Sequence, residues 1–105
     1  MRQFDICELA ATGRRNARRA RLVALLQHDF LSDLGSVVVA PLLPATEDNR
    51  IQRLRPVVKL QREEYVVAVD RLAAVRRQEL GPVAGSIESS SHELRNALDL
   101  LFVGF

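Results

Sequence analysis

Several kinds of residue are scarce in this sequence, and each shortage excludes a class of protein. The 105 residues include one cysteine, no tryptophan and one tyrosine. A single cysteine, Cys7, cannot form an internal disulfide, so we expect a reducing compartment and a buried, inert thiol. No apolar run approaches the roughly 18 residues of a membrane span, and Asp5 and Glu8 argue against a secretory signal. We therefore predict a soluble, cytoplasmic protein with no membrane partner.

The motifs of common enzymes are also missing. The chain has no glycine-rich phosphate loop, no Gly-x-Ser-x-Gly sequence and no Cys/His set with metal-ligand spacing. His28 precedes Asp29, and Ser91 precedes His92, but neighbours in a strand point to opposite faces, so neither pair forms a base held by its neighbour. These observations predict that the protein is not an enzyme and uses no metal and no cofactor.

Basic residues are concentrated in one segment. The formal net charge is only +2, yet five arginines lie in GRRNARRAR, residues 13–21. Such a run is a solvated loop, a contact for an acidic protein or a contact for nucleic acid. No aromatic residue interrupts it to stack on bases, which favours an acidic protein over nucleic acid.

The hydrophobic pattern predicts one domain, residues 1–105, built from strands and a helix. Strands are predicted at residues 3–8, 21–26 and 36–42 and, as a hairpin, 55–69. The first alternates like a half-buried strand, and the third is expected to end or bend at Pro41. Residues 10–21 are expected to form a loop or the tip of a hairpin. Residues 70–85 fit a short helix or an irregular strand, because glycine and proline interrupt helix-forming residues.

The last predicted element is a helix that begins at Ser90. Ser90 and Glu93 have the capping-box spacing, in which hydroxyl and carboxylate bind each other's free backbone amides. Apolar residues then recur every three or four positions as one stripe expected to pack on the sheet: Leu94, Ala97, Leu98, Leu101, Phe102 and Phe105. Gly104 suits a helix exit. Strands followed by a helix indicate an α+β fold with a mostly antiparallel sheet.

The chain ends on an apolar stretch, LDLLFVGF. Docking of the helix on its own sheet accounts for Leu94, Leu98 and Leu101. It accounts less well for residues 103–105, which lie at the end of the helix, where exposed apolar residues often mark protein-binding sites.

Several segments, in order along the chain, are similar to the CcdB family, the toxins of toxin–antitoxin pairs that poison DNA gyrase. They are Gln3–Phe4, Leu22–Gln27 followed by Asp29, Phe30 and Leu31, and then VVVAPL, RPVVKL, LAAV and ELRNALDLLFVGF. The resemblance covers nearly the whole chain. It implies an SH3-like antiparallel β-barrel with a small accessory sheet and a C-terminal α-helix, assembled as a homodimer.

The resemblance also implies partners and contact residues. In the family the last three residues enter the gyrase A subunit and trap the complex with cleaved DNA. The implied gyrase-binding residues are Val103, Gly104, Phe105, Phe102, Asp99, Phe30 and Leu31. Val103 and Asp99 stand where the best-known member has Trp and Asn, and Phe105 is bulkier than the usual Ile. A free carboxylate at Phe105 would add charge.

Family toxins are neutralised by an acidic, disordered antitoxin, so a CcdA-like antitoxin is the second expected partner. On charge alone, the residues that suit it are Arg14, Arg15, Arg18 and Arg19.

Two other functions stay open. A ribonuclease toxin of the MazF type resembles the same barrel, and its candidate catalytic residues would be His28, Arg14 and Ser36. A nucleic-acid-binding module would use the arginine-rich segment and bind DNA with an affinity that falls steeply with salt. The main hypothesis is a binding protein that jams gyrase and does not itself bind nucleic acid.

Overall fold

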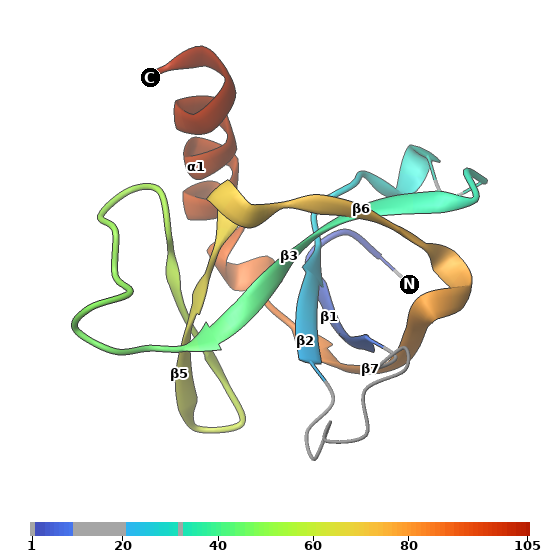
Figure 1. Ribbon diagram of the computed structural model, residues 1–105, viewed down its shortest axis with the longest axis horizontal. Helices are drawn as coiled ribbons and strands as arrows, with labels where there is room; N and C mark the ends of the chain where they lie inside the picture. The colour runs from blue at the N-terminus through green and yellow to red at the C-terminus, as the bar shows by residue number, and fades with distance from the viewer. Residues whose placement is uncertain (1, 10–20, 32) are drawn as a thin grey trace.

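The computed structural model describes residues 2–9, 21–31 and 33–105, in which antiparallel strands form a curled sheet with one α-helix (Figure 1). The strands are β1 (Asp5–Leu9), β2 (Arg21–Leu25), β3 (Ser36–Pro44), β4 (Val57–Leu60), β5 (Glu63–Val67), β6 (Ala73–Arg76) and β7 (Leu80–Ser86). The α-helix, α1, spans Ser91–Val103, and single 3-10 turns, η1 to η4, span Asp29–Leu31, Val69–Arg71, Arg77–Glu79 and Glu88–Ser90. This architecture confirms the predicted α+β class. Of the loop predicted at residues 10–21, residues 10–20 lie outside the described residues and Arg21 begins β2.

Strand β3 joins the two parts of the sheet, whose order is β4-β5-β3-β2-β1-β7 with β6 also paired to β3. Residues 36–39 pair with β6, residues 39–41 with β2 and residues 42–44 with β5. The prediction that the strand ends near Pro41 is wrong, because β3 changes partner there and continues. Proline has no N–H to donate, but the Pro41 carbonyl accepts the Ala68 amide at 2.9 Å.

Strand β1 is buried on both faces, whereas its alternation predicted burial on one. Ile6, with Phe4 just before the strand, packs in the larger core, which the sheet shares with α1. Cys7 faces a smaller core with Val23 and Val39. The predicted burial of Cys7 is confirmed, and that burial raises the pKa of its thiol. The sheet curls over the second face, so a polar–apolar pattern understates the burial of this strand.

The predicted hairpin is confirmed. Strands β4 and β5 pair antiparallel, with Leu60 opposite Glu63. The two residues between them, Gln61 and Arg62, have φ values of 51° and 71°. Positive φ at both positions is the conformation that two-residue hairpin turns require and that Asn-Gly usually supplies.

Residues 70–85, for which the sequence allowed a short helix or an irregular strand, contain most of two strands, β6 and β7, linked by η3. Glycines let β7 lie close to its neighbours. A Cβ at Gly81 would stand 3.2 Å from the Glu8 carbonyl oxygen, and one at Gly85 would collide with the Leu60 side chain. These glycines serve tertiary packing, which local propensity does not reveal.

Helix α1 begins without the predicted capping box. The side chain of Ser90 makes no capping hydrogen bond, so that prediction is wrong. The Ser90 amide, which Glu93 would accept in a capping box, already donates to the Ile87 carbonyl at 2.9 Å, and Ser90 has φ −102° and ψ 16° instead of the extended conformation of a capping residue. None of the helices in the described parts of the chain is long and apolar enough to cross a membrane.

Candidate functional site

The first half of α1 is anchored in the core and its second half is exposed. Leu94 and Ala97 are fully buried, whereas Phe102, Val103 and Phe105 are 69%, 60% and 80% exposed. The prediction of one stripe packed along the whole helix is therefore wrong for its C-terminal end. Figure 1 shows the reason: the last turns of α1 project beyond the strands, so there is no sheet beneath them to cover.

Gly104 ends the helix as predicted. It has φ 94°, and its amide donates to the carbonyls of Asp99 and Leu100, both at 3.1 Å. An L-residue rarely adopts this left-handed conformation, which reverses the chain after the last helical residue. As a result, Phe105 lines a cavity of about 470 Å³ rather than extending the helix axis.

This cavity, hereafter the helix cavity, lies between α1 and the loop before β4. Its lining residues are Arg53, Pro56, Glu93, Asn96 and Phe105. Two of these come from the loop and three from α1 or its end. Apolar ring surfaces and charged or amide groups share the lining, so the cavity suits a partner side chain with both an apolar and a polar part.

A bidentate ion pair fixes the loop wall of the helix cavity. The Arg55 Nε donates to Asp70 Oδ1 at 2.8 Å, and a terminal nitrogen donates to Oδ2 at 2.9 Å. The other terminal nitrogen donates to the Asn49 carbonyl at 3.1 Å. This pairing holds the pKa of Asp70 below its ordinary value. No sequence signal pointed to Arg55, because its partner lies 15 residues away with no motif between them.

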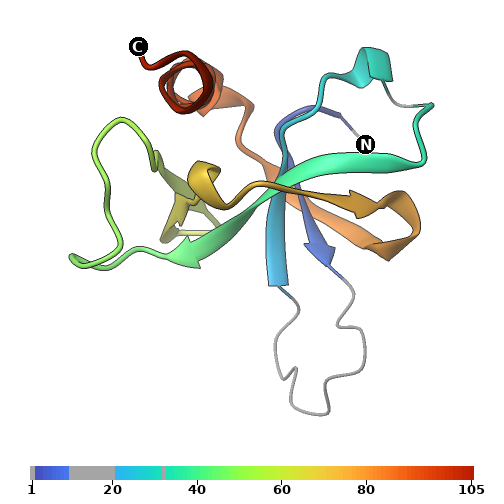
Figure 2. The ribbon, with the colours of Figure 1, turned by 45° about the horizontal axis from the view of Figure 1, so that its top comes forward.

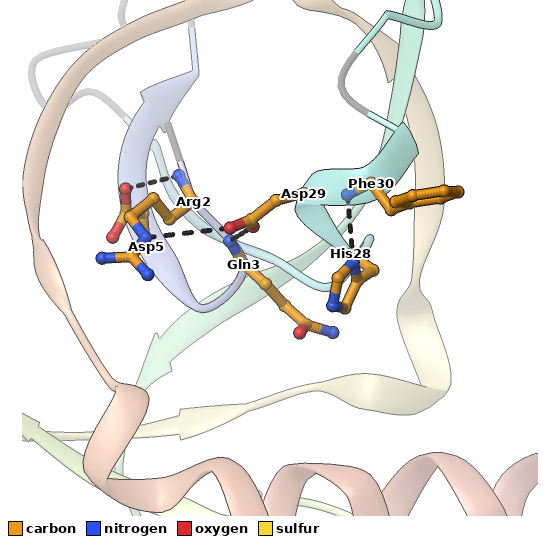
Figure 3. Close-up of polar contacts among 6 residues, drawn as sticks. All are labelled: Arg2, Gln3, Asp5, His28, Asp29 and Phe30. Carbon is orange, nitrogen blue, oxygen red and sulfur yellow. Dashed lines mark hydrogen bonds and ion pairs between the residues drawn. The ribbon is translucent and has the colours of Figure 1, made fainter.

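The second group of predicted contact residues lies on the turn η1. Phe30 is 88% exposed, and Leu31 is exposed as well. Figure 3 shows how this turn is held: the Gln3 amide donates to Asp29 Oδ1 at 2.6 Å, and the Phe30 amide donates to His28 Nδ1 at 3.0 Å. The bond from Gln3, aided by the charges of Arg2 and His28, lowers the pKa of the Asp29 carboxyl.

The structure groups the predicted gyrase-binding residues into two separate places. Asp99 and residues 102–105 gather at the end of α1, whereas Phe30 and Leu31 stand on η1. Both views of the molecule place η1 and the end of α1 on the same side, apart from each other (Figures 1 and 2). One partner surface would have to reach across the gap to touch both.

The candidate catalytic residues do not form a catalytic group. His28 accepts the Phe30 amide, while the neighbouring carboxylate of Asp29 accepts the Gln3 amide instead of holding the imidazole. Ser36 is exposed at the start of β3. His92 is exposed on α1 beside Asn96, with 3.2 Å between Nε2 and Nδ2.

The residues assigned to the antitoxin lie outside the described residues; they are Arg14, Arg15, Arg18 and Arg19. Arg14 is also a candidate catalytic residue of the ribonuclease hypothesis, so that candidate lies outside the described residues as well. Within residues 2–9, 21–31 and 33–105, no three His, Cys, Asp or Glu side chains are grouped so that they could hold a metal ion.

Solved structures of toxins share this fold. The "Mycobacterium tuberculosis toxin MazF-mt6" is 21% identical, with a TM-score of 0.74 over 94% of this chain and 96% of that one. An endoribonuclease in complex with its cognate antitoxin, from a mycobacterial species, is 15% identical, with a TM-score of 0.72 over 100% and 94%. MazF from Deinococcus radiodurans is 15% identical, with a TM-score of 0.68 over 100% and 97%. The predicted fold, an SH3-like antiparallel barrel with a C-terminal helix, is confirmed, and it is that of barrel toxins.

The chain belongs to the CcdB family, whose model, described as CcdB protein, matches residues 3–104. It is therefore a toxin of a toxin–antitoxin pair, and an antitoxin is its partner. No curated protein sequence matches the chain.

The prediction that the protein is not an enzyme is contradicted. It rested on missing sequence motifs, but the same fold occurs in an endoribonuclease that aligns with the whole of this chain. Fold does not determine function, so the absence of common enzyme motifs does not exclude catalysis on this barrel.

Proposed function

We propose that this toxin binds the A subunit of DNA gyrase through its C-terminal residues and traps the gyrase–DNA cleavage complex. The main support is the exposed apolar end of an anchored helix. Leu94 is fully buried, so α1 is fixed to the core while Phe102, Val103 and Phe105 face solvent. A helix that is already fixed to the core loses little backbone entropy on binding, and aromatic anchors that become buried contribute much of the energy of protein interfaces.

The other proposed contact residues supply charge and a second apolar surface. Asp99 is exposed on α1 and would pair with a basic residue of the partner. Gly104 directs Phe105, and Phe30 with Leu31 would touch the same partner from η1.

We further propose that the toxin is a homodimer and that a CcdA-like antitoxin contacts Arg14, Arg15, Arg18 and Arg19. Family membership and the clustered charge support these assignments. Light scattering of the purified chain tests the dimer. If alanine at all four arginine positions leaves antitoxin affinity and its salt dependence unchanged, the antitoxin assignment is wrong.

Deletion of Gly104 and Phe105 tests the gyrase contact. We expect the deletion to abolish growth inhibition and inhibition of supercoiling, because it removes the most exposed aromatic residue of the helix end. Val83→Ala is the matched control: it trims an exposed apolar residue on β7, away from both contact groups, and should leave toxicity unchanged. Resistant survivors should carry changes in the gyrase A gene. Toxicity that persists after the deletion would contradict the proposal.

RNA cleavage is the second candidate function. The specific observation in its favour is that the His28 ring and the cations Arg2 and Arg77 line one small depression on the surface, together with the Asp29 carboxylate, whose Oδ2 lies 3.7 Å from Arg2 Nε. Purified protein separates the two functions. A ribonuclease would cut RNA, lose that activity in His28→Ala and leave supercoiling unaffected, whereas the gyrase poison would stop supercoiling.

A further inference from the structure

Arg77 lies in η3, between β6 and β7, yet its side chain reaches back to the loop before β3. Its Nε donates to the Leu34 carbonyl at 2.5 Å, and one terminal nitrogen donates to the Leu31 carbonyl at 3.3 Å. Its own amide donates to the Gly35 carbonyl at 3.0 Å. A single residue thus binds three carbonyls of one loop, and hydrogen bonds from a guanidinium are stronger than those between neutral groups.

The same loop is held from its other end. Gln27 Nε2 donates to the Leu31 carbonyl at 3.2 Å, and Gln27 Oε1 accepts the Val38 amide at 3.3 Å. The Leu31 carbonyl therefore accepts from both Gln27 and Arg77. On the N-terminal side, Asp29 is tied to the Gln3 amide, as Figure 3 shows.

These ties hold a loop whose apolar side chains are not used in the core. Phe30, Leu31 and Leu34 are all exposed, Phe30 almost completely. In an exposed loop, water satisfies backbone carbonyls at little cost, so core packing does not account for a guanidinium committed to two of them. An aromatic side chain displayed on backbone that several hydrogen bonds hold is instead suited to a binding surface, because pre-ordering lowers the entropy lost on association.

We propose that Arg77 is a positioning residue for the partner contact of Phe30 and Leu31, which together form a preformed knob that fits a concave apolar pocket on the partner. The inference rests on the proposed gyrase contact, since gyrase A is the partner that would supply the pocket. Arg77 touches the loop backbone and acts through Phe30 without being part of the contact itself.

Binding of purified variants to the gyrase A dimerisation fragment tests the proposal. Arg77→Met keeps a flexible, unbranched side chain like the arginine stem but removes the donors, and we expect about a tenfold loss of affinity. Arg77→Lys keeps the charge and one donor group, so its loss should be smaller. Arg76→Met is the matched control, because it removes an exposed neighbouring arginine with the same charge, and it should change affinity less than about twofold.

Coupling to Phe30 separates positioning from a general structural role. If Arg77 acts through Phe30, then Arg77→Met added to Phe30→Ala should weaken binding by less than about twofold further. If the affinity loss of the double variant equals the product of the losses of the two single variants, the proposal is overturned.

Amide exchange in the free protein tests the same point without gyrase. In Arg77→Met the amides of Leu31 and Leu34 should exchange at least about tenfold faster, while the amides of β1 stay protected. Unchanged exchange at both residues overturns the positioning role. If the unmodified protein does not bind gyrase A, the proposed function fails, and the exchange rates alone decide whether Arg77 holds the loop. Should Arg77→Met not fold, Arg77→Lys gives the same readouts.

Discussion

Replacing Arg55 with methionine should destabilise the fold more than any other single change at an arginine in the described parts of the chain. The side chain is 9% exposed and makes two hydrogen bonds to Asp70 and one to the Asn49 carbonyl. Methionine is also unbranched and flexible but shorter, so it fills the space of the arginine stem and donates nothing. The change therefore removes mainly the contribution of the guanidinium.

The expected loss of stability follows from the Asp70 carboxylate, which the substitution leaves without its partner. Removing one partner of a buried ion pair costs about 3 to 5 kcal/mol, because the other charge stays desolvated. Here the Asp70 side chain keeps 25% of its surface exposed, and water can partly rehydrate it. We therefore expect Arg55→Met to lower the free energy of unfolding by about 2 to 3 kcal/mol. In a domain of this size, that loss lowers Tm by about 10 to 20 °C.

Urea unfolding as a function of pH provides the assay. Because Arg55 lowers the pKa of Asp70 below its ordinary value of 3.8, the pair stabilises the folded state fully above that pH. The contribution disappears as the pH falls through the lower folded-state pKa, where the carboxylate takes up a proton. The difference between the unmodified protein and Arg55→Met should thus be constant near neutral pH and shrink in acid.

Arg53→Met is the control for this experiment. Arg53 is exposed and two positions away, so its loss should change stability by less than about 0.5 kcal/mol. If Arg55→Met costs no more than this control, or if its cost stays the same down to about pH 2, the ion pair does not stabilise the loop as argued here.

Three further predictions concern stability and reactivity. Gln61→Asn combined with Arg62→Gly should raise the free energy of unfolding by about 1 kcal/mol without changing the urea m-value, because both positions have positive φ; a loss of stability would contradict the turn assignment. Leu94→Ala should lower it by about 3 kcal/mol, since the side chain is fully buried, and a cost below about 1 kcal/mol would mean that α1 is not docked. Cys7 should react with a thiol reagent only after unfolding, because burial hides the thiol and raises its pKa; rapid labelling of the folded protein would refute this.

Local patterns predicted the elements whose sequence and packing agree. Alternation in β1, the β-branched run of β3 and the paired runs of β4 and β5 each matched a strand that the sheet then used. The apolar periodicity after Ser91 matched α1. The patterns gave the type of each of these elements, but not every buried side chain: Cys7 is buried on the second face of β1, and Phe102 and Phe105 at the end of α1 are exposed.

The remaining features depend on contacts that a sequence pattern does not contain. Phe102 and Phe105 have the same helical spacing as Leu94, and spacing alone does not show where the sheet beneath a helix ends. Gly81 and Gly85 look like breakers of a helix, yet they allow close passage of β7. Arg77 meets a carbonyl 43 residues earlier, which no local signal announces.

The residues of the candidate functional site were only partly predictable from the sequence. The family resemblance predicts the helix end as a contact site, and the exposure of Phe102, Val103 and Phe105 agrees with that prediction. The helix cavity was missed, because Arg53 and Pro56 come from a loop with no motif and meet Phe105 only through the turn at Gly104. The exclusion of catalysis failed because missing motifs say little about a fold whose chemistry depends on groups brought together in space.

The shared strand β3 has a consequence for how mutations in this toxin are tolerated. Because its nine residues are hydrogen-bonded to β6 and β5 on one edge and to β2 on the other, a slip by one residue against any neighbour would turn its buried valines outward and break the other ladders together. A misaligned pairing therefore loses hydrogen bonds to more than one neighbouring strand. A substitution in one of the surrounding strands is therefore opposed by the pairing of β3 with the other two, which keeps the alignment of the whole sheet.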